Sequence, residues 1–394
     1  MKGIGVVETN FVEIASLEQP FVLENGEQLK RVRLAYETYG KLNEKRTNAI
    51  LVFHALSGSA HAAGVNKFDK HWDDSALDKT IWTDECVIGW WDSFIGPGRA
   101  FDTDKYFIIC VNYVGSCYGS TGPSSLDPDT GRPYGNRFPD VTVSDIVRSQ
   151  VKLLDHLGIE RLLATTGGSL GGMMAIDVAM QFPERVRLVI PLASGVYTPA
   201  LTRVLNFEQL FALQEDPNFN RGDYYDGPLP YQGMVLARMI GHKTFVSLDV
   251  MQERAKGHIV QDDNDLKGYQ LRHQIESYML HQGKKFARRF DANSYVKILT
   301  AWQSYDVAQT YGNGNLVNAF HASLNHRYLV VSIDSDVCFW PEEQALIARA
   351  LTSAGVDYRY VTVHSDKGHD SFLLEPDLYA PLLTYALAEE LKAL

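Results

Sequence analysis

Hydrophobic residues gather along the chain in short runs that predict buried β-strands. The runs that are rich in Val, Ile and Leu lie at residues 49–56, 106–114, 161–167, 187–194 and 328–334. Another run, at residues 31–40, alternates hydrophobic and polar positions. Continuous rather than alternating runs indicate strands that are covered on both faces of a sheet, and such sheets are usually parallel. The pattern therefore predicts a mostly parallel central sheet.

Amphipathic segments between these runs predict helices. Residues 142–157 have apolar positions at helical spacing, and the segment ends before Gly158, a residue that favours the left-handed turn after a helix. Residues 171–182 predict the next helix, which Pro183 stops. Because strands and helices alternate, we predict an α/β fold that is wound on both faces of its sheet.

The alternation of strands and helices stops after Ser194. The segment that follows is rich in aromatic and charged residues and has helical spacing but no strand pattern. A last strand pattern, at residues 358–365, and a C-terminal helix come after it. We therefore predict a core of residues 1–194 and 326–394, into which a helical cap (lid) of residues 195–325 is inserted.

Composition and charge exclude several classes of protein. The 394 residues include 37 Lys and Arg against 48 Asp and Glu, a net charge of −11, and no basic block. Such a chain is a poor partner for nucleic acid or for an anionic membrane. The N-terminus lacks the apolar region of a signal peptide, no apolar run is long enough to span a membrane, and the four cysteines form no CxxC pair. We predict a cytoplasmic protein with reduced thiols.

A G-x-S-x-G motif at residues 167–171, centred on Ser169, carries the clearest chemical signal. It lies where a predicted strand passes into a predicted helix, which is the position of a nucleophile elbow. In an elbow the serine backbone is strained, Cβ atoms on the flanking glycines would collide with the neighbouring strand and helix, and the helix N-terminus offers free N–H groups. A plain glycine turn is the alternative interpretation.

A serine hydroxyl needs a base to become a nucleophile. With an elbow, the acid and then the base follow the serine along the chain, each after a late strand. Asp334 and Asp336 follow the run at 328–334, and both are candidates for the acid. His369 is favoured as the base over His364, which lies at the end of a strand rather than in the loop beyond it. No ligand spacing such as HExxH suggests a metal.

A tetrahedral intermediate also needs donors for its oxyanion. One donor is expected to be the N–H of Leu170, directly after the serine, and the other an N–H in the loop after the run at 49–56, from Leu56 or Ser57. The alternative is that His54 and its neighbours only form the turn that ends the strand.

Eight motifs occur in order along nearly the whole chain: HALSG (54–58), GWWDSFIGPG (89–98), GSTGPSS (119–125), GGSLGGM (167–173), LARMIGH (236–242), RFDANSY (289–295), SDVCF (335–339) and GHDSFLLE (368–375). Together they resemble the homoserine O-acetyltransferase family of methionine biosynthesis and its relatives that use succinyl-CoA or serine. The resemblance implies an α/β-hydrolase fold. It implies a triad of Ser169, Asp336 and His369, which decides against Asp334, and an oxyanion hole at Leu56 and Leu170.

The resemblance also implies a site for the amino-acid substrate. Arg238 matches the arginine that holds the α-carboxylate, and Asp370 matches the acidic residue that meets the α-ammonium group. Two positions depart from the family pattern: Phe245 stands where a tyrosine is common, and Ser116 where a glycine is common. Both departures concern the choice of acyl donor.

The reaction that the resemblance implies is a ping-pong transfer of acetyl from acetyl-CoA, a co-substrate, to the γ-hydroxyl of L-homoserine, without a bound cofactor. It also implies a homodimer formed through the helical cap. The alternatives are a homoserine or serine O-succinyltransferase and a serine esterase. The candidates for contacts with the negatively charged CoA are Lys243, Lys284, Lys285, Arg288 and Arg289.

Overall fold

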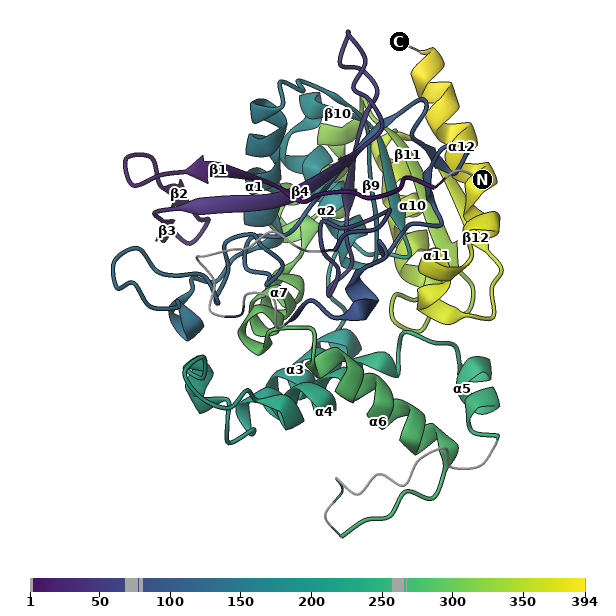
Figure 1. The fold of residues 1–394 in the computed structure, drawn as a ribbon. Helices are drawn as coiled ribbons and strands as arrows, with labels where there is room; N and C mark the ends of the chain where they lie inside the picture. The colour runs from purple at the N-terminus through teal and green to yellow at the C-terminus, as the bar shows by residue number, and fades with distance from the viewer. Residues whose placement is uncertain (1–2, 68–76, 78–80, 257–265, 267, 394) are drawn as a thin grey trace.

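The computed structural model describes residues 3–67, 77, 81–256, 266 and 268–393 (Figure 1). The strands of its central sheet are β1 (Asn10–Ala15), β4 (Val32–Tyr39), β5 (Ala49–Phe53), β8 (Phe107–Val111), β9 (Leu162–Gly168), β10 (Val186–Leu192), β11 (Arg327–Ile333) and β12 (Asp357–Val363). Their order is β1-β4-β8-β5-β9-β10-β11-β12. All pairs from β8 to β12 are parallel, whereas β4 pairs antiparallel with β1 and β8. The prediction of a mostly parallel sheet is confirmed.

Position in the sheet explains the hydrophobic pattern. The central strands β5 and β9 are buried along their whole length, as their continuous apolar runs predicted. In β4 the burial is interrupted at intervals, which matches its alternating sequence. The edge strand β1 was not predicted, because only two of its six residues are buried and its apolar pattern is weak. Two short ladders, β2 (Phe21–Val22) with β3 (Gln28–Leu29) and β6 (Ile95–Gly96) with β7 (Phe101–Asp102), lie outside the sheet.

Helices cover both faces of the sheet (Figure 1). Helices α1 (Val143–His156), α2 (Leu170–Gln181) and α10 (Pro341–Ala354) pack into one apolar cluster, and α12 (Pro376–Lys392) packs into a second. The predicted boundaries of α1 and α2 are close to those observed. Thr142 caps α1 reciprocally with Asp145, and α2 ends at the residue before Phe182.

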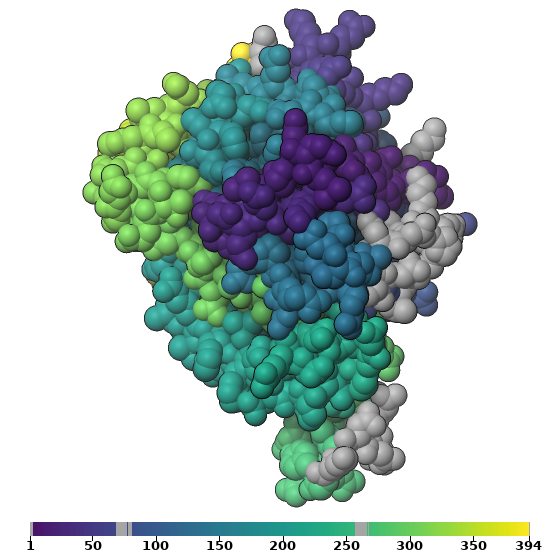
Figure 2. All heavy atoms as spheres, turned by 90° about the vertical axis from the view of Figure 1, so that its left-hand side faces the viewer, coloured from purple at the N-terminus to yellow at the C-terminus, as the bar shows by residue number. Residues whose placement is uncertain are grey.

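The chain between β10 and β11 is helical, and the described part of it contains no strand. Its helices are α3 (Ala200–Gln214), α4 (Tyr231–His242), α5 (Leu248–Arg254), α6 (Gln274–Ala287), α7 (Ala292–Ser304), α8 (Val307–Gly312) and α9 (Leu316–Phe320). Helices α3 to α6 form a lobe that extends away from the sheet (Figures 1 and 2). None of the described helices has the length and apolar character that crossing a membrane requires.

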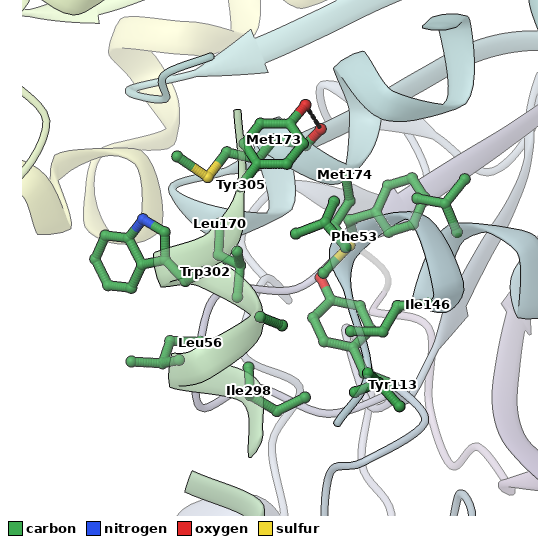
Figure 3. Packing of buried hydrophobic residues seen from close by; sticks show 14 of the residues in the cluster. Phe53, Leu56, Tyr113, Ile146, Leu170, Met173, Met174, Ile298, Trp302 and Tyr305 are labelled. Atoms are coloured by element: carbon green, nitrogen blue, oxygen red, sulfur yellow. Dashed lines mark hydrogen bonds between the residues drawn. The ribbon is translucent and has the colours of Figure 1, made fainter. Parts of the chain in front are cut away.

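The last part of this helical segment packs against the core. The hydroxyl of Tyr305 donates to the carbonyl of Met173 in α2 (3.0 Å; Figure 3), and the hydroxyl of Tyr311 donates to Asp177 in the same helix (2.8 Å). The helix that follows the elbow is thus tied to residues of the predicted cap. The division of the chain into a core and a cap of residues 195–325 stays a prediction.

Candidate active site

Ser169 lies in a strained turn between β9 and α2. Its φ of +60° and ψ of −129° form a conformation that a residue with a side chain rarely adopts. Two hydrogen bonds hold the turn: the Ser169 N–H donates to the carbonyl of Leu192 (3.0 Å), and the hydroxyl of Ser194 donates to the carbonyl of Ser169 (2.7 Å). Strain that is held in this way is typical of a functional residue.

The flanking glycines allow the turn to pack against β5. A Cβ atom on Gly171 would lie 2.4 Å from the carbonyl oxygen of Phe53, and one on Gly167 would lie 2.7 Å from the same oxygen. Both distances are shorter than real Cβ contacts, and backbone cannot move aside cheaply. The predicted collision is therefore confirmed at these two positions.

Asp336 and His369 form a buried pair. Nδ1 of His369 lies 2.7 Å from Oδ2 of Asp336, and Oδ1 of Asp336 accepts hydrogen bonds from the N–H groups of Cys338 (2.8 Å) and Phe339 (3.0 Å). A carboxylate only accepts, so Nδ1 carries the proton and Nε2 can take another. Nε2 has no hydrogen-bond partner among the described residues.

The rival residues form a separate pair at the surface. Nδ1 of His364 lies 2.8 Å from Oδ2 of Asp334, with exposed side-chain fractions of 85% and 42%. Neither residue lines the cavity described below. The two Asp–His pairs are almost equally spaced in the sequence, and burial distinguishes them.

Ser169 and His369 line a cavity of about 190 Å³. The other residues that line it come from distant parts of the chain: Ala55, Leu56, Ser57, Gly58, Trp90, Arg238, Phe245, Arg289, Trp302, Asp370, Phe372 and Leu373. Leu56 and Leu170 belong to the same apolar cluster as Ile298 and Trp302 of α7 (Figure 3). The structure thus brings the predicted nucleophile, base and substrate-binding residues to one cavity, next to both predicted oxyanion donors.

Opposite charges stand on the wall of this cavity. The guanidinium of Arg238 lies over the rings of Phe245 (4.9 Å to the centroid) and Phe286 (4.8 Å). Burial raises the pKa of Asp370, while His369 and Arg238 act to lower it. A guanidinium and a carboxylate in one partly buried cavity suit a zwitterion, with its carboxylate on the arginine and its ammonium on the aspartate.

Some of the residues singled out in the sequence for the choice of acyl donor or for contacts with CoA line the cavity, and others do not. Phe245 and Arg289 line the cavity, whereas Ser116 is buried and does not. Nζ of Lys285 lies 3.0 Å from Oε1 of Glu85. Lys243 lines a different, apolar groove.

Sequence reasoning assigned no role to three aromatic residues of the cavity wall. These are Trp90, Trp302 and Phe372. Trp90 and Phe372 lie inside two of the quoted motifs, which is a signal that could have identified them. Trp302 comes from α7 and has no such signal.

Comparison with known proteins identifies relatives over the whole chain. The family model of the alpha/beta hydrolase fold matches residues 48–376. The chain is 42% identical over 375 residues to a homoserine O-acetyltransferase of Deferribacter desulfuricans, covering 95% of this chain and 94% of that one. It is similar to the crystal structure of homoserine O-acetyltransferase from Bacillus anthracis (TM-score 0.84, 26% identity, 98% of both chains). It is also similar to esterase E22 (TM-score 0.83, 29% identity, 97% of this chain and 100% of that one).

Proposed function

Because the chain belongs to the homoserine O-acetyltransferase family, we propose that it transfers the acetyl group of acetyl-CoA to the γ-hydroxyl of L-homoserine. It is an acyltransferase of methionine biosynthesis with an α/β-hydrolase fold. One observation carries the proposal: a single cavity holds Ser169, His369, the guanidinium of Arg238 and the carboxylate of Asp370. We propose that acetyl-CoA is a co-substrate, that the enzyme needs no bound cofactor or metal, and that it acts in the cytoplasm.

In the first half-reaction His369 takes the hydroxyl proton of Ser169 as the oxygen attacks the thioester carbonyl. The N–H groups of Leu56 and Leu170 stabilise the oxyanion that forms. When the carbon–sulfur bond breaks, His369 returns the proton to the sulfur. CoA leaves as a thiol, and acetyl-serine remains.

In the second half-reaction L-homoserine enters the cavity. Arg238 holds its carboxylate and Asp370 its ammonium group, which directs the γ-hydroxyl to the acetyl-serine. His369 takes the hydroxyl proton, the oxygen attacks the acetyl carbonyl, and His369 then returns the proton to Ser169. The product is O-acetyl-L-homoserine.

Hydrolysis is the competing function, because esterase E22 has a similar structure. In a hydrolase water is the acceptor and needs no groups that bind an amino acid. The presence of both Arg238 and Asp370 on the cavity wall favours a zwitterionic acceptor, and therefore transfer.

Release of free thiol tests the proposed function. The enzyme is mixed with acetyl-CoA or succinyl-CoA, and with homoserine, serine or no acceptor. We expect rapid release only with acetyl-CoA and homoserine together. Preference for succinyl-CoA would overturn the acetyl assignment, and preference for serine would overturn the homoserine assignment. Either result would leave the proposed mechanism unchanged. Equal release without an acceptor would overturn the transferase and the roles of Arg238 and Asp370.

The charge state of His369 sets the expected pH dependence. Burial disfavours the imidazolium, but Asp336 and Asp370 outweigh burial and raise the pKa of His369 above its ordinary value of 6.5. The base must be neutral, so kcat/KM should fall about tenfold per pH unit below that raised pKa. Asp370→Asn should move the fall to lower pH. The measurement is p-nitrophenol release from p-nitrophenyl acetate, which has no ammonium group. A shift to higher pH would contradict this account.

We also propose that two copies pair through the predicted cap. Four apolar residues on one face of α3 are each more than half exposed: Leu201, Val204, Phe207 and Phe211. Helices α4 to α6 carry an apolar groove of about 870 Å³, lined in part by Leu236, Met239 and Met279. Large exposed apolar patches often mark protein–protein interfaces, and the exposed apolar residues of α3 together with the groove on α4 to α6 suit a self-complementary dimer.

Light scattering tests the dimer. The wild-type protein should have twice the mass of one chain. Introducing Phe207→Glu together with Phe211→Glu should halve it, because two charges would be buried without partners. Leu17→Glu, at an exposed leucine outside the cap, is the control and should leave the mass unchanged. A monomeric wild type would refute the pairing.

A further inference from the structure

The carbonyl group of Ala55, in the turn after β5, is held by two donors. Nδ1 of His54 lies 2.7 Å from this oxygen, and the N–H of Gly58 donates to it (3.0 Å). The Ala55 carbonyl and the Leu56 N–H belong to one planar trans peptide, so they point in opposite directions. Fixing the carbonyl therefore fixes the direction of the Leu56 N–H.

We propose that His54 is a positioning residue, which aims the Leu56 N–H at the oxyanion by holding the Ala55 carbonyl. The inference rests on the proposed function, in which Leu56 is an oxyanion donor. It assigns a role to a side chain that does not itself line the cavity, since Ala55, Leu56 and Ser57 line it and His54 does not.

The imidazole of His54 is fixed on several sides. Its ring stacks on the ring of Tyr113, with centroids 3.6 Å apart and planes 19° apart. The hydroxyl of Tyr113 donates to the carbonyl of His54, so one residue holds both the ring and the main chain. A Cβ atom on Gly58 would lie 2.7 Å from Cβ of His54, so the turn closes tightly over this side chain. A side chain held in this way can orient the peptide that it binds.

The protonation state of His54 agrees with this role. Burial lowers its pKa to about 3, so the ring is neutral at physiological pH and carries one proton. The Ala55 carbonyl can only accept, which places that proton on Nδ1. Nε2 is then a buried acceptor, and it has no partner among the described residues. An unpaired buried acceptor is destabilising, so packing alone does not explain a histidine here.

A second carbonyl of the turn, that of Ser57, accepts a hydrogen bond from a residue of the predicted cap. Nη1 of Arg289 donates to the carbonyl of Ser57 (3.1 Å) and to the hydroxyl of Tyr118 (3.1 Å). The turn that carries the Leu56 N–H is therefore fixed by a core residue on one side and by a residue of the inserted segment on the other.

Three substitutions at one position separate positioning from packing. His54→Asn places an N–H where Nδ1 stands, His54→Gln places one a carbon further out, and His54→Phe keeps the flat ring against Tyr113 without a donor. Thermal unfolding is measured for each variant. Activity is measured as CoA release with acetyl-CoA and homoserine, and as p-nitrophenol release from p-nitrophenyl acetate.

Positioning predicts that kcat falls about 100-fold in His54→Phe and His54→Gln, the order of an oxyanion donor that is lost or misaimed. In His54→Asn kcat should stay within about tenfold of wild type, and the KM for homoserine should change little in all three. If packing alone mattered, the order would reverse, with Phe tolerated and Asn most damaging. That order, or an equal loss of kcat in His54→Asn and His54→Gln, would overturn the proposal. If His54→Phe does not fold, the comparison of His54→Asn with His54→Gln still tests it.

Failure of the proposed function would look different. The p-nitrophenyl acetate assay forms the acyl-enzyme without CoA or homoserine, and it needs the oxyanion hole all the same. Suppose that the wild type does not acetylate homoserine, but that turnover of p-nitrophenyl acetate still falls more in His54→Phe and His54→Gln than in His54→Asn. The transferase function would then be refuted, and the positioning role of His54 would be supported. If the wild type acetylates homoserine but the three His54 variants do not differ in this order, only the positioning role is refuted.

Discussion

Ser169→Ala should abolish acyl transfer, lowering kcat by roughly 10⁵-fold or more, the scale seen when a serine nucleophile of this kind is removed. Without the hydroxyl, no acetyl-serine forms, and both half-reactions lose the intermediate that they share. The residual rate reports only the oxyanion donors and substrate binding. The measurement is CoA release, together with acetyl label retained on the protein after denaturation.

The fold should survive this change. Alanine and serine both carry a Cβ atom, so the strain at φ +60° is the same in the two proteins. Ser149→Ala is a matched control, because Ser149 is buried in α1 and its hydroxyl donates to the carbonyl of Ile146 in the same helix. That variant should keep wild-type kcat. Full turnover in Ser169→Ala, or label still attached to it, would refute the nucleophile.

The sheet and the elbow could be predicted because their signals are local. Strands β5 and β9 lie at the centre of the sheet, and burial on both faces demands continuous apolar runs. Gly167 and Gly171 are needed because they pack closely against the carbonyl of Phe53. The motif shows that these positions require glycine, but it does not show which residue they contact. Strand β1 was not predicted, because an edge strand buries few residues and its sequence therefore has only a weak apolar pattern.

The acid could not be chosen from the residues alone. Asp334 and Asp336 follow the same strand, and each has a histidine near the end of β12. Asp336 is buried and held by two backbone N–H groups, whereas Asp334 is half exposed. Burial of this kind depends on packing between distant segments, which local patterns do not encode. Family resemblance supplied the choice that spacing left open.

The walls of the cavity show the same limit. Phe245 lies in the turn between α4 and α5, Trp302 lies in α7, and Phe372 comes from the C-terminal part of the chain. Their convergence depends on how the helices pack, not on any repeat in the sequence. Arg238 lies inside one of the quoted motifs and could be predicted, whereas Trp302 lies in none of them and could not.

Arg238→Ala should lower kcat/KM for homoserine about 100-fold or more, mainly by raising KM, because a partly buried guanidinium–carboxylate pair is costly to break. Formation of the acyl-enzyme should change little, since acetyl-CoA and p-nitrophenyl acetate do not need this arginine. The loss also removes the cation that lowers the pKa of Asp370, so this carboxyl should become easier to protonate and hold the ammonium group less well.

Two further substitutions separate charge from packing at Arg238. Its guanidinium lies over Phe245 and Phe286, so alanine removes apolar contact as well as charge. Arg238→Met keeps much of the contact and should be as poor with homoserine as alanine. Arg238→Lys keeps the charge without the planar fork and should fall between methionine and wild type. An equal loss in p-nitrophenyl acetate turnover in all three would mean that Arg238 supports the fold of the cavity, and the carboxylate contact would have to be assigned to Arg289, the other guanidinium on its wall.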